Sequence, residues 1–299
     1  MIEIKNLTKN FFSVKALDDI DFNIEEGSIY GLVGSNGSGK STLMRLISGV
    51  YIADSGEILV DNEVSFDNPA VKTKIMFVGD TPYFLSQSNL KEMAELYASM
   101  YENFSWDTYN YLLTVFPLSQ KAKLSSFSKG MQRQAALILA LASRPKYLLL
   151  DEAFDGLDVV MRRVLANLLI EDVEERGMTV MIASHNLREL EDVCNHIGLI
   201  HNGKLILGGE TEEVRSNIYK VQVAFKNAVS DEAFKGLDIL KLEKTGSVYQ
   251  IVARGEKQGI MDYVNSLFPI FAECIEPTLE EIFIFELEAL GYDIKNILS

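Results

Sequence analysis

The stretch Gly34-Ser35-Asn36-Gly37-Ser38-Gly39-Lys40-Ser41, followed by Thr42, decides the fold of this chain. It matches G-x-x-x-x-G-K-[ST], a glycine-rich loop that cradles phosphate groups between a strand and a helix. The apolar run 29–33 predicts a buried strand before the loop, and residues 42–47 predict a helix after it. Glycines let successive N–H groups point at one anion, and the helix N-terminus adds partial positive charge. The sequence therefore predicts a site for a nucleoside triphosphate.

Each polar position of this loop has an expected role. Lys40 should reach the β- and γ-phosphates, and the Ser41 hydroxyl should ligate Mg²⁺. The alternative is a glycine-rich turn that happens to precede a lysine, and the strand–loop–helix context disfavours it. The expected nucleotide-binding residues of the loop are Ser35, Asn36, Gly37, Ser38, Gly39, Lys40, Ser41 and Thr42.

Composition limits the remaining possibilities. The 299 residues allow one large domain or two ordinary ones, and a hydrophobic share of 47% allows a sizeable core. Two cysteines and three histidines are too few for a disulfide or metal framework, so we expect a reducing cytoplasm. The net charge of −15 disfavours nucleic acid as a partner. The densest apolar run, 135–142, is far shorter than the ~20 residues of a membrane span. Any membrane role should therefore depend on a partner.

Two further apolar runs end in polar residues. Residues 147–150 lead into Asp151-Glu152, and residues 179–183 lead into Ser184-His185. Unbroken apolar runs are typical of central parallel strands, and open α/β sheets bind ligands at the carboxyl ends of such strands. We expect Asp151 to bind Mg²⁺ through water and Glu152 to act as the general base for the attacking water. In isolation, two acids after a strand would indicate only a solvated strand end.

The rest of the chain predicts two domains, 1–215 and 216–299. Alternation in residues 2–24 predicts strands, and residues 82–144 show helical periodicity, as in a helical subdomain. After Gly208-Gly209 the order is strand, short helix, a hairpin over 239–253, a helix near 257–268 and a last strand near 272–275. This order predicts a small α+β domain of the split βαβ type. A helix with Thr278 as N-cap and Glu281 in a capping box follows.

Three motifs carry a family resemblance. Residues 125–132, Ser-Ser-Phe-Ser-Lys-Gly-Met-Gln, resemble a variant of the signature motif of ABC ATPases. Asp155-Gly156-Leu157-Asp158 resembles the D-loop of that family, and Ser184-His185 resembles its switch histidine. Order and spacing match from about residue 2 to 209. The resemblance implies a P-loop NTPase (RecA-like) cassette with antiparallel β and helical subdomains, which hydrolyses ATP as a head-to-tail dimer.

The resemblance also implies roles for single residues. Ser128 and Gly130 would touch the γ-phosphate of ATP across the dimer interface, although Ser128 can also simply cap its helix. His185 would contact the γ-phosphate and the attacking water. Phe11 lies where the family stacks an aromatic ring on adenine, with core packing as an open alternative, and Val14 would join it in the nucleotide site.

Two positions depart from the family pattern. Lys129 replaces the first of the two glycines that usually follow the signature serine. Asp80 follows the short strand 75–78, where the Q-loop of the family usually has glutamine. An aspartate there can still offer an oxygen to Mg²⁺ or its water.

The resemblance implies the ATP-hydrolysing subunit of a bacterial ABC transporter of the ABC-2 exporter type. It would pair with a separate transmembrane permease at the inner face of the membrane, as a homodimer or heterodimer. The C-terminal domain resembles those of exporters of peptides, antibiotics or lipids, and residues 100–106 resemble ATPases of Gram-positive toxin-peptide or antimicrobial exporters. Two alternatives are a soluble ABC ATPase acting on a macromolecule and a regulatory module without turnover. We expect the permease to bind aromatic residues of the helical subdomain that are not buried in its core, drawn from Tyr83, Phe84, Tyr97, Tyr101, Phe104, Trp106, Tyr109 and Tyr111.

Overall fold

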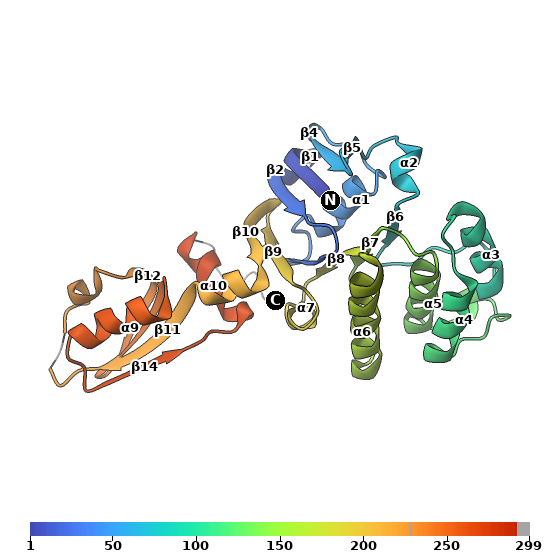
Figure 1. Ribbon diagram of the computed structural model, residues 1–299. Helices are drawn as coiled ribbons and strands as arrows, with labels where there is room; N and C mark the ends of the chain where they lie inside the picture. The colour runs from blue at the N-terminus through green and yellow to red at the C-terminus, as the bar shows by residue number, and fades with distance from the viewer. Residues whose placement is uncertain (228, 292–299) are drawn as a thin grey trace. The chain divides into compact units, whose positions relative to one another are not determined.

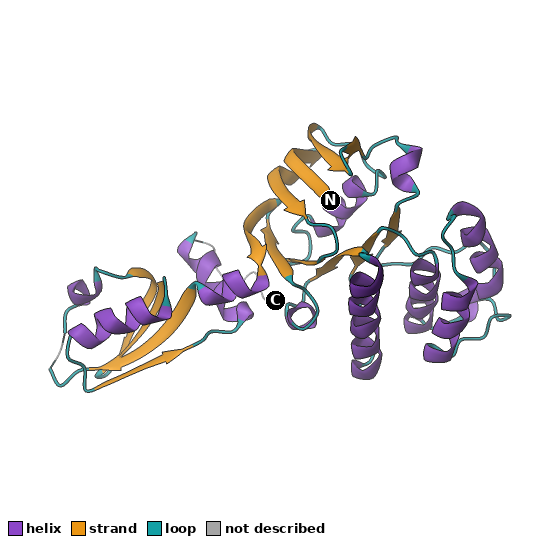
Figure 2. Cartoon of the chain, in the orientation of Figure 1, coloured by secondary structure: helices purple, strands orange, loops and turns teal. Residues whose placement is uncertain are grey.

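The computed structural model describes residues 1–227 and 229–291, which form two compact units. Unit 1 comprises Met1–Cys194 and Ile200–Leu205, and unit 2 comprises Asn195–Leu199 and the described chain from Ile206 onward. Helices and strands alternate along much of the chain, and both units contain sheets and helices (Figure 2). The predicted α/β class is confirmed.

A six-stranded sheet in the order β10-β9-β3-β8-β7-β6 organises the nucleotide-binding part of the fold. Its parallel core pairs β3 (Ile29–Val33) with β8 (Thr179–Ser184), β8 with β7 (Tyr147–Asp151), and β7 with β6 (Ile75–Val78). Strands β3, β7 and β8 are buried along their whole lengths, which explains their unbroken apolar sequences. The carboxyl ends of these strands share one edge of the sheet. The other two strands are β9 (His196–His201) and β10 (Lys204–Glu210).

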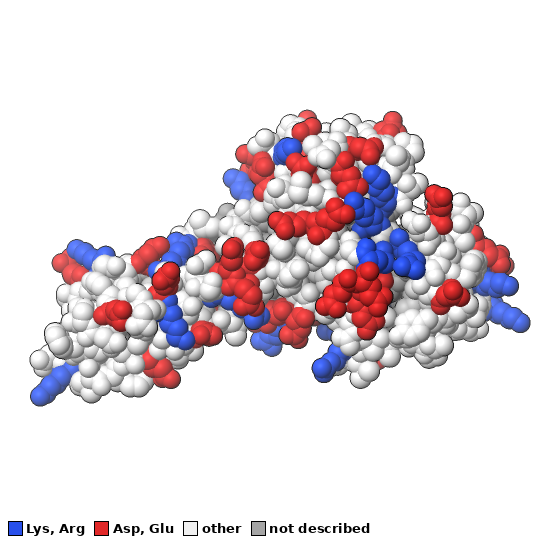
Figure 3. Space-filling view, in the orientation of Figure 1, with Lys and Arg blue, Asp and Glu red and all other residues white. Residues whose placement is uncertain are grey.

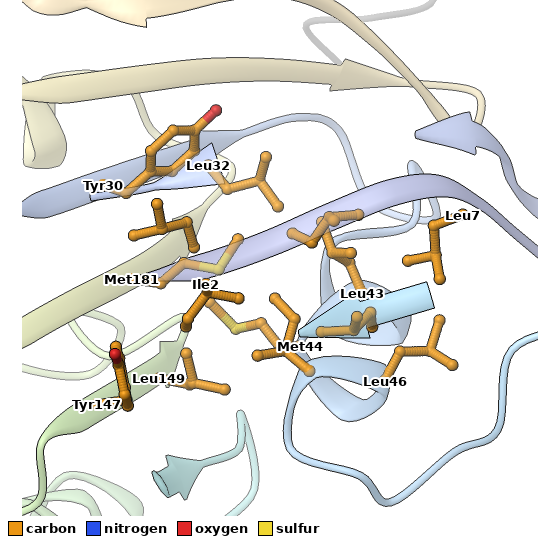
Figure 4. Close-up of a cluster of buried hydrophobic side chains, with 14 of the residues drawn as sticks. Ile2, Leu7, Tyr30, Leu32, Leu43, Met44, Leu46, Tyr147, Leu149 and Met181 are labelled. Atoms are coloured by element: carbon orange, nitrogen blue, oxygen red, sulfur yellow. The ribbon is translucent and has the colours of Figure 1, made fainter. Parts of the chain in front are cut away.

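A second, antiparallel sheet has the order β2-β1-β4-β5. It contains β1 (Ile2–Phe11), β2 (Val14–Ile24), β4 (Ser55–Val60) and β5 (Glu63–Val64). Between this sheet and the parallel strands lies α1 (Lys40–Ile47), whose Leu43, Met44 and Leu46 enter one hydrophobic core with Ile2, Tyr30 and Leu149 (Figure 4). The core fixes the helix that follows the phosphate loop. The short helix α2 (Pro69–Lys72) leads into β6.

The segment predicted to be helical contains α3 (Leu90–Met100), α4 (Trp106–Val115) and α5 (Lys129–Ala142), with the short 3₁₀ turn η1 (Leu124–Ser126) before α5. Figure 1 shows α3, α4 and α5 together, and α3 and α4 both pack on α5. A capping box at Asn89 starts α3. Ser105 caps α4, and its N–H donates to the carbonyl of Ala142 (2.7 Å). Two more helices of unit 1 flank β8, namely α6 (Val159–Arg176) and α7 (Arg188–Glu191).

Unit 2 contains a four-stranded antiparallel sheet in the order β12-β13-β11-β14. The strands are β11 (Ile218–Ala224), β12 (Asp238–Thr245), β13 (Val248–Arg254) and β14 (Phe271–Ile275). The helices are α8 (Thr211–Ser216), α9 (Lys257–Ser266) and α10 (Leu279–Ala289). The first helix of the predicted split βαβ pattern is only a 3₁₀ turn, η2 (Asp231–Phe234). The predicted hairpin and the capping box of Thr278 and Glu281 are confirmed.

Two helix boundaries differ from the sequence expectation. Helix α1 begins at Lys40 although its apolar periodicity starts at Thr42, because the first turn of a helix can be polar when its free N–H groups face a ligand or water. Helix α9 ends at Ser266 rather than Phe268, where the backbone takes a left-handed conformation (φ 53°) that a helix cannot continue.

Candidate active site

The phosphate loop has the backbone geometry that its glycines predict. Gly37 and Gly39 have φ values of 79° and 115°, a region that other residues rarely adopt. A side chain at Gly39 would also lie 2.6 Å from the carbonyl oxygen of Ala16, and one at Gly34 would lie 2.3 Å from that of Ile200. Glycine is therefore required at both Gly34 and Gly39. Gly39 is the N-cap of α1, so the free N–H groups of that helix open directly onto the loop.

The side chain of Lys40 is buried against the phosphate loop. Only 5% of the residue is exposed, and its Nζ donates to the carbonyl oxygens of Gly34 (2.6 Å) and Ser35 (3.2 Å). The same Nζ lies 3.5 Å from Oε1 of Glu152. Burial lowers the pKa of Lys40, and the negative charge of Glu152 opposes this shift. The lysine thus joins the phosphate loop to the end of β7.

Asp151, the last residue of β7, is buried, and neither of its carboxylate oxygens has a hydrogen-bond partner among the described residues. Burial raises its pKa; the nearby Ser41 hydroxyl opposes this shift without meeting the geometry of a hydrogen bond. A buried carboxylate without donors is costly unless a cation satisfies it. The Oγ of Ser38 is likewise buried without a partner in the described chain. The donor set of Asp151 and Ser41, with the glycine cradle beside it, fits a divalent cation bound to phosphate.

Glu152 lies at the centre of the site. Its Oε2 accepts from Nδ1 of His185 at 2.9 Å and from the backbone N–H of the same residue at 3.3 Å. The two residues come together because β7 and β8 are neighbours in the sheet and both end at this edge. The backbone of Glu152 is left-handed, with a φ of 52°. Such a conformation is uncommon for a non-glycine residue and concentrates at functional sites.

A hollow of about 370 Å³ opens over the loop and contains most of the predicted site. Phe11 does not line it; its ring is half-buried and packs edge-on against Tyr51 with centroids 5.4 Å apart. Asp80 lines the hollow, and its Oδ1 lies 4.0 Å from Nη2 of Arg45. The lining residues are Val14, Lys15, Ala16, Asn36, Gly37, Ser38, Gly39, Lys40, Ser41, Thr42, Asp80, Glu152 and Asn202.

Ser128 and Gly130 lie at the start of α5 and do not line this hollow. Ser128 is the N-cap, and its hydroxyl accepts from the N–H of Met131 at 3.3 Å. A side chain at Gly130 would lie 2.8 Å from the carbonyl oxygen of Gly156, so this glycine permits close packing on the segment after β7. Within one chain, these two residues therefore do not contribute to the hollow over the phosphate loop.

Sequence reasoning missed Arg133, which the structure places against the active site. This buried residue of α5 donates to the carbonyl oxygens of Asp151, Glu152 and Asp80. A signal was present in the sequence: Arg133 lies four and seven residues before Leu137 and Ala140, on a helix face whose other members are apolar and buried. A cation on a core-facing stripe has to find polar partners inside the fold.

Comparisons with known proteins agree with this geometry. Residues 17–155 match the family of ABC transporters. The chain is 32% identical to the ABC transporter ATP-binding protein YtrB of Bacillus subtilis (strain 168), over 95% of this chain and 97% of that protein. It is 31% identical to the bacitracin transport ATP-binding protein BcrA of Bacillus licheniformis, over 69% and 68% of the two chains. A bacterial ABC transporter cassette solved as a dimer superposes with a TM-score of 0.64 and 25% identity, covering 70% of this chain and 98% of that one. This chain belongs to the family of ABC transporter ATP-binding proteins.

Proposed function

We propose that this transport ATPase powers an exporter and uses Glu152 as the general base for ATP hydrolysis. One observation carries the assignment of the base: the carboxylate of Glu152 lies between Nζ of Lys40 (3.5 Å) and Nδ1 of His185 (2.9 Å), beside the phosphate loop. A base in that position can take a proton from a water held next to the γ-phosphate. His185 then orients the carboxylate, and Lys40 holds the phosphates.

The remaining residues of the site bind nucleotide and metal in this proposal. Ser41 and Asp151, with Asp80 nearby, would hold Mg²⁺, which when bound offsets the charge of the β- and γ-phosphates. The buried carboxylate of Asp151, which has no hydrogen-bond partner in the described part of the chain, supports this assignment. Backbone N–H groups of the loop and the start of α1 bind the phosphate oxygens. Val14, which lines the hollow, and Phe11, whose ring contacts Tyr51, would lie on the base side of the nucleotide.

The active unit in this proposal is a head-to-tail dimer, with a second copy or another ATPase subunit as partner. Ser128 and Gly130 would complete the site of the partner, because a helix N-terminus with a hydroxyl and free N–H groups suits a γ-phosphate. Their separation from the hollow within one chain supports a role across an interface. The cassette would span 1–215 and the accessory domain 216–299.

The membrane partner is a permease, bound at the cytoplasmic face in this proposal. None of the helices in the described chain is long and apolar enough to span a bilayer. Among the aromatic residues considered for docking, Tyr83, Trp106 and Tyr111 are exposed, whereas Tyr109 is buried. The drawn face of the molecule carries acidic patches with smaller basic groups among them (Figure 3). We infer that an apolar segment of the permease docks near Tyr83.

The proposed cargo is a peptide, an antibiotic or a lipid-like molecule. The similarity to BcrA, which is named for bacitracin transport, supports this class. The accessory domain and the segment 100–106 support it as well, through the exporter resemblance described above.

The test is Mg²⁺-dependent ATP hydrolysis by the purified chain and by Glu152→Gln. We expect the variant to lose roughly 10²–10⁴-fold in turnover, the usual contribution of a general base, while it still binds ATP. Glu174→Gln, the same change at an exposed residue of α6, is the matched control and should keep the wild-type rate. Wild-type turnover in Glu152→Gln would overturn the assignment of the base.

A further inference from the structure

Arg133 is a buried cation that binds backbone rather than a carboxylate. Only 9% of the residue is exposed, and it forms no ion pair with any acidic side chain in the described ranges. Instead, Nη1 donates to the carbonyl oxygens of Asp151 (3.4 Å) and Glu152, and Nη2 donates to that of Asp80. Desolvating a guanidinium is costly, so three carbonyl groups have to be held in place around it. This contact therefore constrains the backbone of three residues at the ends of two strands.

The contact with Glu152 bears directly on the proposed base. A left-handed conformation is strained for a non-glycine residue, so it persists only where the surroundings enforce it. The N–H of Glu152 donates to the carbonyl of Ala183 (2.9 Å), and its carbonyl accepts from Arg133. The same carbonyl also accepts from the N–H of Asp155 (3.1 Å). These three bonds fix both peptide groups that flank the strained residue. They determine the direction in which its side chain leaves the backbone, toward Lys40 and His185.

The Nη2 group of Arg133 donates to a residue that follows the neighbouring strand, β6. Asp80 follows β6, and β6 pairs with β7 in the parallel sheet. Arg133 thus holds Asp80, the second residue after β6, and Glu152, the first residue after β7, in one fork, through Nη2 and Nη1 respectively. A guanidinium suits this task because its donors have a fixed planar geometry, whereas a lysine ammonium acts as a point charge.

Arg133 also connects this pair of strand ends to the start of its own helix. It lies five residues after Ser128, roughly 7.5 Å along α5 at 1.5 Å per residue. Ser128 and Gly130 form the first turn of the same rigid element. Any displacement of α5 must therefore move Arg133 and the carbonyl groups it binds, or break those bonds.

We propose that Arg133 is a positioning residue that holds Glu152 in its active orientation and couples α5, with Ser128 and Gly130, to the two strand ends. The inference rests on the proposed role of Glu152 as general base. Arg133 acts through Glu152 and does not touch nucleotide. A shift of α5 on binding a partner would then change the rate of hydrolysis through this contact.

Steady-state kinetics of Arg133→Gln and Arg133→Lys provide the first test. A misplacement of about 1 Å in a catalytic group can cost roughly 10²-fold, so we expect kcat of Arg133→Gln to fall about 100-fold. Arg133→Lys keeps the charge but loses the fork, and should fall about 10-fold. The KM for ATP, and the Kd measured with a fluorescent ATP analogue, should change less than about 2-fold. Arg163→Gln, which removes an exposed arginine of α6, should leave all of these values unchanged.

A double-mutant cycle with Glu152→Gln separates positioning from a general structural role. If Arg133 acts through Glu152, Arg133→Gln should lower the residual rate of the Glu152→Gln protein by less than about 2-fold. An equal loss in both backgrounds would overturn the proposal, as would a parallel loss of kcat and ATP affinity. The Glu152→Gln variant by itself tests whether Glu152 is the general base. A wrong assignment of the base can therefore be told apart from a wrong assignment of Arg133 as a positioning residue.

Thermal unfolding measurements check that each variant is folded. If Arg133→Gln does not fold, Arg133→Lys takes its place in both tests, and a folded Arg133→Lys protein with wild-type kcat would refute the positioning role.

Discussion

The carboxylate of Asp61 accepts hydrogen bonds from several residues at the edge of the fold that lies away from the phosphate loop. It follows β4 and binds two residues that precede parallel strands, through Nζ of Lys74 (3.2 Å) and Nζ of Lys146 (3.0 Å). The hydroxyl of Tyr147, the first residue of β7, donates to the same carboxylate (2.5 Å). Burial alone would raise the pKa of Asp61, but these three donors outweigh it and hold the pKa well below its ordinary value.

We therefore predict a pH-dependent loss of stability in Asp61→Asn. A carboxyl group whose folded-state pKa is depressed stabilises the fold above its unfolded pKa of about 3.9, and this contribution disappears as the pH falls toward the folded-state value. The variant should lose about 1 kcal/mol in the free energy of unfolding at pH 7, a modest value because the cluster lies near the surface. The difference from wild type should shrink below about pH 4.

Urea titrations at pH 7 and at lower pH measure this difference. Asp67→Asn is the matched control, because Asp67 shares the left-handed backbone (φ 53°) but is exposed and has no ion pair among the described residues. The control should match wild type at every pH. If the destabilisation of Asp61→Asn does not change with pH, the negative charge of Asp61 is not what stabilises this part of the fold, and the prediction is wrong.

At the scale of elements, the buried strands and the loop between β3 and α1 were predictable from sequence alone. Strands β7 and β8 are short apolar runs that end in polar residues, and parallel pairing brings Glu152 and His185 together as expected. The packing of long side chains was not predictable in this way. Phe11 packs on Tyr51, and Arg133 reaches strand ends that are far away in sequence, because tertiary contacts decide both orientations. Periodicity identifies which face of an element is buried, but it does not identify the residues that the face contacts.

The segment that joins β6 to α3 offers a test of permease docking. Tyr83 is 81% exposed and Leu85 is also exposed, and both lie between Asp80 and the start of α3. An aromatic anchor at the centre of an interface typically contributes 2 kcal/mol or more. We predict that Tyr83→Glu lowers co-purification with the membrane subunit at least about 10-fold while ATP binding stays unchanged.

Val64→Glu, which introduces the same charge at an exposed apolar residue of β5, is the control and should co-purify normally. Full recovery of the complex with Tyr83→Glu, and with further charge substitutions at Leu85 and Tyr111, would place the docking surface elsewhere on the protein.

At the scale of the whole molecule, the described chain forms two units, and each has its own hydrophobic core. Unit 1 buries apolar residues around α1 and the parallel strands, and it contains the phosphate loop, Glu152 and His185. Unit 2 has its own core, which includes Val221, Phe234 and Ile251. Within unit 2, α10 is fixed to the sheet by charged pairs with three different strands, Lys220–Glu281 (2.7 Å), Lys241–Glu288 (3.3 Å) and Arg254–Glu286 (2.5 Å).

We therefore predict that a chain ending at Asn217, between α8 and β11, still binds ATP. The residues that line the hollow over the phosphate loop all precede this cut, so the Kd for ATP should stay within about 3-fold of the full-length value. The truncation should instead alter dimerisation, which is measured by sedimentation in the Glu152→Gln background with ATP and Mg²⁺. Circular dichroism and thermal unfolding establish that the shortened chain is folded. A folded truncation that fails to bind ATP would show that unit 2 contributes to nucleotide binding, and an unchanged dimer equilibrium would exclude unit 2 from the dimer interface.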